Sequence, residues 1–117
     1  MEKSFQNVGI FYNPEIQEAS QTAKMLSDKI ANSTIYSIND LKNDIDLAIT
    51  VGGDGSFLKV ARYYSQYSTP ILGVNMGRLG YLAQVKPDEI DSAINKIKSG
   101  QYEIENRLML KAIGKTA

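Results

Sequence analysis

One carboxylate stands among glycines at positions 51–56, where an apolar run ends in Val-Gly-Gly-Asp-Gly-Ser. Because glycine has no Cβ, its backbone N–H groups can approach a ligand closely, and phosphate oxygens suit such donors. A carboxylate would repel phosphate, unless it faces a hydroxyl group that must lose its proton or a magnesium ion carried in with a nucleotide. Phosphoryl transfer needs both kinds of group side by side. The segment therefore predicts a phosphate-facing loop of Gly52, Gly53 and Gly55, with Asp54 as the reactive group.

The same residues also fit an ordinary turn, in which an aspartate caps the next helix with a side-chain oxygen. Their spacing matches neither the GxxxxGK pattern of a Walker A loop nor the GxGxxG pattern of dinucleotide-binding folds. The residues alone thus leave two interpretations of Asp54 open, a reactive carboxylate or a helix cap.

A second glycine-bearing loop follows the next apolar run, and its residues 73–81 read Gly-Val-Asn-Met-Gly-Arg-Leu-Gly-Tyr. Asn75 could hold a hydroxyl group, and Tyr81 could stack on a base. Leu79 also fits a packing residue, and Arg78 a solvated charge. Two glycine loops at neighbouring strand ends predict one shared crevice. The candidate ligand-binding residues of this second loop are Asn75, Gly77, Leu79, Gly80 and Tyr81.

Composition removes several other chemistries. The 117 residues include no histidine and no cysteine, which excludes histidine-based triads, disulfides and thiolate metal sites. Thirteen basic and thirteen acidic side chains cancel, so no net charge favours a nucleic acid. No stretch approaches the roughly 20 apolar residues that a membrane span needs. We therefore expect a soluble, cytoplasmic protein with no nucleic-acid or membrane partner.

The elements that must position these loops alternate along the chain. Apolar residues recur at intervals of three and four from Ile16 to Ile30, and again within residues 86–100, and both patterns predict amphipathic helices. The run Ile45–Val51 is almost wholly apolar, as in a strand covered on both faces, and a helix is expected from about Ser56. Other strands are expected before Asn13 and at 33–38 and 69–75. This alternation predicts an α/β fold, a Rossmann-like parallel sheet with flanking helices, whose ligands gather at the carboxyl ends of the strands.

The pattern changes after Tyr102. The remaining residues read as one or two further strands that stop without a capping or turn signal. We expect residues 1–102 to form the α/β nucleotide-binding domain with the GGDG motif. Residues 103–117 are expected to begin a β-rich second domain that the sequence does not complete.

The two loops together resemble the NAD kinase (ATP-NAD kinase) family, whose amino-terminal domain carries GGDGT followed by NxGxLGFL. Here the motifs read GGDGS at 52–56 and NMGRLGYL at 75–82. The likeness runs over nearly the whole chain, from an opening strand that ends in Asn-Pro to the helix written PDEIDSAI. Ser56 in place of threonine keeps the hydroxyl group, and Tyr81 in place of phenylalanine adds one.

The resemblance implies transfer of a phosphoryl group from ATP or polyphosphate to the 2′-hydroxyl of the adenosine ribose of NAD, giving NADP. Mg²⁺ or another divalent cation would accompany ATP. Asp54 would accept the proton, and Asp54 and Gly55 would form part of the NAD site. Gly52 and Gly53 would shape the phosphate-facing backbone.

By the same match, Asn75 and Tyr81 would line the pocket near the adenosine. Some members have a basic residue near NAD where this chain has Lys59, which fits a surface lysine equally well. The family continues into a β-rich carboxyl-terminal domain with an Asn-Glu motif that these 117 residues do not contain. We therefore expect the chain to be inactive by itself, and the full-length protein to be a homo-oligomer, a dimer or tetramer.

Two alternatives remain at this stage. One is a GGDG-type kinase of another substrate, a lipid or a sugar phosphate. Phosphofructokinases open with a glycine-rich loop after the first strand, and diacylglycerol and sphingosine kinases place Asn-Glu after GGDG; this sequence does neither. The other alternative is a nucleotide-binding module without catalysis.

Overall fold

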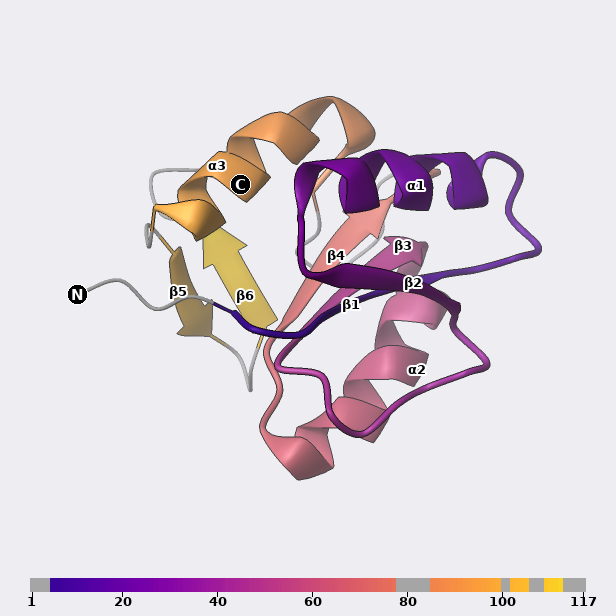
Figure 1. Cartoon of the computed structure of the whole chain (residues 1–117). Coiled ribbons are helices and arrows are strands. Elements are labelled where there is room, and N and C mark those ends of the chain that lie inside the picture. Colours follow the sequence, from indigo (N-terminus) through magenta and orange to yellow (C-terminus); the bar gives the residue numbers. More distant parts are fainter. Residues whose placement is uncertain (1–4, 78–84, 100–101, 106–108, 113–117) are drawn as a thin grey trace.

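A computed structural model describes residues 5–77, 85–99, 102–105 and 109–112. Strands and helices alternate along most of this part of the chain (Figure 1). The strands are β1 (Val8–Tyr12), β2 (Ser33–Ser37), β3 (Leu47–Gly52), β4 (Ile71–Asn75), β5 (Tyr102–Glu105) and β6 (Met109–Ala112). The α-helices are α1 (Ala19–Lys29), α2 (Asp54–Tyr64) and α3 (Ile90–Lys98), with 3₁₀ turns η1 (Ser65–Tyr67) and η2 (Pro87–Glu89). The predicted α/β class is confirmed.

The strands form one sheet in the order β2-β1-β3-β4-β6-β5. The pairs from β2 to β6 are parallel, and only the β5–β6 pair among the described strands is antiparallel. In the ladder Tyr12 lies opposite Ser37 and Val51, and Gly52 lies opposite Asn75. The carboxyl ends of β1, β2, β3 and β4 therefore meet at one edge of the sheet, here called the carboxyl edge.

Helices cover both faces of the sheet. Helices α1 and α3 lie on one face over residues such as Ile10 and Ile49, whereas α2 lies on the other over Phe11 and Ala48 (Figure 1). Because β1 leads through α1 to β2 and β3 leads through α2 to β4, the direction of winding reverses between β1 and β3. Such a reversal leaves a crevice at the carboxyl ends of the two strands, where open α/β sheets bind ligands.

Two helices begin at positions that differ from the sequence expectation. The periodic pattern begins at Ile16, but α1 begins at Ala19, because Glu18 adopts a left-handed conformation with φ of 71°. Helix α2 was expected from about Ser56 and begins at Asp54, directly after the extended residue Gly53. The carboxylate of Asp54 therefore belongs to the first turn of α2. None of the helices in the described part of the chain is long and apolar enough to cross a bilayer.

Tyr64 on α2 is hydrogen-bonded to the segment that connects β2 to β3. Its side chain is fully buried beside Phe11, and its hydroxyl donates to the carbonyl oxygen of Lys42 at 2.5 Å. The same hydroxyl accepts the backbone N–H of Lys42 at 3.1 Å. Burial raises the pKa of Tyr64 to about 12, although the hydrogen bond from the Lys42 backbone works in the opposite direction.

This pKa predicts a loss of stability in alkali. Both the folded and the unfolded chain keep the Tyr64 proton below pH 10 or so, but the unfolded chain releases it first as the pH rises toward 12. The free energy of unfolding should therefore fall over this interval. Tyr64→Phe should lose about 1–2 kcal/mol at pH 8, because two hydrogen bonds disappear, and should show a smaller further loss at pH 11. Urea titrations at both pH values measure this, with Tyr12, a partly buried residue at the end of β1, changed to Phe as the control. Equal alkaline losses in the three proteins would contradict the assignment.

Candidate functional site

The first glycine loop joins β3 to α2 at the carboxyl edge. Gly53 is the only residue between the two elements and has extended backbone angles, φ −114° and ψ −163°. Its carbonyl oxygen accepts the N–H of Phe57 at 3.0 Å, which is the first hydrogen bond of α2. Gly53 is thus the N-cap of the helix, and Asp54 is not the capping residue. Asp54 lies partly buried in the first turn, where the helix dipole favours its negative charge.

The glycines of this loop have different surroundings. A Cβ on Gly52 would lie within 2.8 Å of the Cβ of Ser56, so the buried Gly52 allows the close approach of α2 to the sheet. A Cβ on Gly53 or Gly55 would meet no atom within 4 Å. Gly52 is therefore needed for packing. Gly53 and Gly55 face open space, where a ligand has room to approach the backbone.

Asn13 was not among the predicted site residues, but it contacts this loop directly. It follows β1, and its side-chain Nδ2 donates to the hydroxyl oxygen of Ser56 at 3.1 Å. Its backbone N–H donates to the carbonyl oxygen of Val51 at 3.0 Å. The sequence marked this position only by the Asn-Pro pair that ends the first strand. That pair predicted a turn, but it did not indicate that the Asn13 side chain would bond to Ser56.

The second glycine loop lies beside the first. The N–H of Met76 donates to the carbonyl oxygen of Gly52 at 2.9 Å, which joins the two loops. Asn75 is almost fully buried, and its Oδ1 accepts the N–H of the exposed Gly77 at 2.9 Å. That Asn75 oxygen therefore closes a turn in its own loop. The other predicted residues of this loop lie outside the described residues: Leu79, Gly80 and Tyr81.

Lys59 lies on a different side of the loop from Asn75. Its Nζ donates to the Oδ1 of Asn39 at 2.6 Å, and Asn39 comes two residues after the end of β2. Since β2 and β4 lie on opposite sides of β3, Lys59 and Asn75 belong to opposite flanks of the Gly53–Gly55 segment. The exposed ammonium group of Lys59 extends positive charge along the carboxyl edge toward β2.

The donors available for a metal ion are few. Within the described ranges, no three Asp, Glu, His or Cys side chains group closely enough to hold a cation. A single carboxylate, Asp54, stands in the glycine loop. Mg²⁺ in nucleotide sites is usually held by one or two carboxylates together with phosphate oxygens and water. The residues present therefore fit a cation that arrives on a nucleotide better than a resident metal ion.

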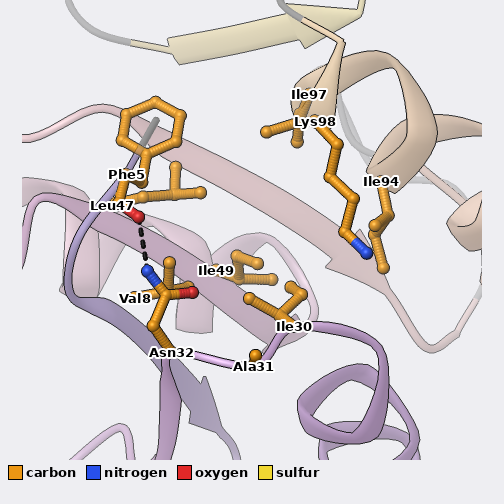
Figure 2. A pocket seen from close by; sticks show the side chains of 10 residues that line it. All are labelled: Phe5, Val8, Ile30, Ala31, Asn32, Leu47, Ile49, Ile94, Ile97 and Lys98. Atoms are coloured by element: carbon orange, nitrogen blue, oxygen red, sulfur yellow. Dashed lines mark hydrogen bonds between the residues drawn. The ribbon is translucent and has the colours of Figure 1, made fainter. Parts of the chain in front are cut away.

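A cavity of about 310 Å³ lies away from the glycine loops. It opens between the carboxyl-terminal ends of α1 and α3, at the edge where β1 and β3 begin with Val8 and Leu47 (Figure 2). The residues at the bottom of the cavity are apolar and almost fully buried; Ile49, for example, has no exposed surface. The lining contains one charged side chain, Lys98, and no acid. This cavity is not the predicted site, which occupies the opposite edge of the sheet.

Fold and loop together define an α/β protein with a glycine-rich strand–helix junction at the carboxyl edge of a parallel sheet. The family described as ATP-NAD kinase N-terminal domain matches residues 19–102. The chain belongs to this family.

Individual relatives agree with the family assignment. An NAD kinase of Carboxydothermus hydrogenoformans is 45% identical over 78 residues, covering 67% of this chain and 28% of that protein. An NAD kinase of Clostridium beijerinckii is 36% identical over 115 residues, covering 89% and 40%. The chain thus spans well under half the length of these relatives. The crystal structure of an NAD kinase from Archaeoglobus fulgidus in complex with ATP has the same fold, with a TM-score of 0.59 and 18% identity over 83% of this chain and 39% of that one.

The different surroundings of the glycines give a stability test. Gly52→Ala should lower the free energy of unfolding by about 1–3 kcal/mol, because the new Cβ overlaps Ser56 and forces α2 away from the sheet. Gly55→Ala should leave stability unchanged or raise it by up to about 1 kcal/mol, because the site is open and alanine favours the helix. Chemical denaturation of both variants measures the difference. Equal losses would mean that Gly52 is not held against Ser56.

Proposed function

We propose that this chain forms the nucleotide-handling domain of an NAD kinase. The reaction is transfer of the terminal phosphoryl group of ATP, or of polyphosphate, to the 2′-hydroxyl of the adenosine ribose of NAD, which gives NADP. The observation that carries the proposal is the position of Asp54: it is the acidic residue in the first turn of α2, next to glycines whose backbone is open to a ligand. Membership of the ATP-NAD kinase family supports it.

Asp54 is proposed as the proton acceptor. The ribose 2′-oxygen attacks the terminal phosphorus, the bond from that phosphorus to the leaving phosphate oxygen breaks, and the hydroxyl proton passes to the carboxylate. ADP, or a shortened polyphosphate, leaves with the electron pair of the broken bond. Asp54 is only partly buried, so a substrate can approach this residue.

The backbone around Asp54 would receive the phosphates. The first N–H groups of a helix have no partner within the helix, and together with the dipole they attract anions. Gly53 and Gly55 leave the space in front of these groups free of side chains. Mg²⁺ would arrive bound to ATP and would neutralise phosphate charge that Asp54 otherwise repels.

The remaining residues have proposed places around this centre. Gly77 offers a second open stretch of backbone beside Gly52, and Lys59 supplies a cation on the β2 flank. The placement of Asn75 and Tyr81 near the adenosine of NAD rests on the family pattern. Leu79 and Gly80 are proposed only as further nucleotide-binding residues of the same loop.

Domain organisation is also a proposal. Strands β5 and β6 extend the sheet beyond β4, and the proposed boundary between residues 102 and 103 falls at the start of β5. We propose that residues 103–117 lead into a second, β-rich domain that completes the NAD site, in a cytoplasmic homo-oligomer. Since the chain spans 28% and 40% of the two relatives named above, we expect it to bind nucleotide but to form no NADP by itself.

Turnover by a protein that also carries the proposed second domain tests the role of Asp54. Asp54→Asn should lower kcat by about 10²–10⁴-fold, the usual contribution of a general base, while the Kd for NAD stays nearly unchanged. Asp28→Asn is the matched control, since Asp28 is an exposed acid near the end of α1. NADP formation and NAD titration measure the two quantities. Full activity in the Asp54 variant would remove it from the mechanism.

Binding by the 117-residue chain separates the proposed function from its alternatives. NAD and ATP with magnesium should each raise the melting temperature, because a ligand that binds only the folded state stabilises it. Stabilisation only by a sugar phosphate or a lipid would favour another GGDG-type kinase. Nucleotide binding with no turnover, even with the second domain present, would favour a non-catalytic module.

A further inference from the structure

Three of the hydrogen bonds of Asn13 bear on the glycine loop, at the point where the sheet reverses its winding. Its backbone N–H donates to the Val51 carbonyl oxygen at 3.0 Å, and its Oδ1 accepts the N–H of Glu15 at 2.9 Å. Its Nδ2 donates to the Ser56 hydroxyl oxygen at 3.1 Å. The first bond fixes the Asn13 backbone to β3, and the second fixes the rotation of its amide. The Asn13 side chain is therefore held in place by the first two bonds when it donates the third bond to Ser56 on α2.

Ser56 receives this bond beneath Gly52. Its side chain is 4% exposed and occupies the space that a Cβ on Gly52 would need. A hydroxyl group in such a place is too enclosed to reach a ligand, and its burial requires a hydrogen-bond partner. Asn13 is the partner. The contact links the end of β1 to the first turn of α2, which carries Asp54.

Because Gly53 and Gly55 have no side chains, side-chain packing at these two positions cannot set the orientation of the loop. A Cβ at either position would touch nothing within 4 Å, so the space beside these two α-carbons is open. The Met76 N–H holds Gly52 from the β4 side. The Asn13–Ser56 bond holds the opposite flank, from the β1 side. An open backbone binds a ligand tightly only if it is already held in one orientation, because ordering a mobile loop on binding weakens the affinity.

We propose that Asn13 is a positioning residue for the Gly53–Gly55 segment: through Ser56 it fixes the first turn of α2 in the orientation that binds the phosphates of a nucleotide. The second part of this proposal, the binding of nucleotide phosphates by the segment, rests on the proposed function. Asn13 itself need not touch the substrate. Its effect passes through the Ser56 hydroxyl to the backbone on either side of Asp54.

Two single changes and their combination remove the contact, and two other single changes preserve it. Asn13→Ala and Ser56→Ala each remove one partner, and the double variant removes both. Ser56→Thr keeps the hydroxyl group. Asn13→Asp keeps an acceptor for the Glu15 N–H and presents a second oxygen to which the Ser56 hydroxyl can donate. Asn95→Ala, at an exposed position on α3, and Ile97→Val, in the core, are controls for a neutral change and for a general loss of stability.

The NMR signals of the backbone amides in the 117-residue chain report the conformation of the loop in the absence of a ligand. In Asn13→Ala and Ser56→Ala, the N–H signals of residues 53–57 should shift, and hydrogen exchange at Phe57 should accelerate about fivefold relative to the rest of α2, the effect of one hydrogen bond. The double variant should add nothing further, because both single changes break the same contact. Ser56→Thr and Asn13→Asp should keep exchange close to that of the unmodified chain. Ile97→Val should lower the melting temperature and leave these signals in place.

Titration with ATP and magnesium then measures the consequence for binding. The affinity should fall about fivefold in the two alanine variants and in their combination, and stay unchanged in Ser56→Thr and in both controls. Asn13→Asp should keep the slow exchange of Phe57 but weaken ATP binding, since it adds a negative charge beside the phosphates.

The two levels of the proposal can fail separately. Unchanged signals at residues 53–57 in Asn13→Ala, or additive effects in the double variant, would overturn the positioning role. Disturbed signals with unchanged ATP affinity would also overturn it, since orientation would then not matter to the ligand. If the unmodified chain does not bind ATP while its loop responds as expected, the proposed function fails and the contact retains only its role in loop structure.

Discussion

The missing side chain at Gly52 is the constraint on which the arrangement of the carboxyl edge depends. Ser56 occupies the space where a Cβ would otherwise stand, and this lets the first turn of α2 lie directly against the end of β3. Any other residue at position 52 would push the helix outward and move Asp54 with it. The carbonyl oxygen of the same glycine accepts the Met76 N–H and so ties the second loop to the first.

Within five residues the glycine motif combines two physical roles that look alike in the sequence. Gly52 is buried and required by packing, whereas Gly53 and Gly55 face open space and expose backbone. Between them a carboxylate lies at the positive end of a helix, where its charge is favoured. The first turn of α2 thus combines open backbone and a carboxylate in a chain that contains no histidine and no cysteine.

The parts of the fold that follow from periodicity were predictable. The helical pattern ending near Lys29 and the apolar run before Gly52 depend on local spacing, and both elements are present. Helix starts were less predictable, because they depend on neighbouring segments: Glu18 in a left-handed conformation delays α1, and Ser56 packed under Gly52 lets α2 begin at Asp54. The alternative interpretation of Asp54 as a helix cap was wrong, since Gly53 holds the N-cap position.

The sequence by itself determined the α/β class, the two glycine loops and their place after β3 and β4, because these depend on residues close together in the chain. Only the tertiary structure decided which glycine is packed and which are open, that Lys59 pairs with Asn39, and that Asn13 reaches Ser56. These contacts join residues 20 and 43 positions apart. No local pattern specifies such partners, since they are brought together by the parallel pairing of β1 with β2 and β3 and by the reversal of winding between β1 and β3.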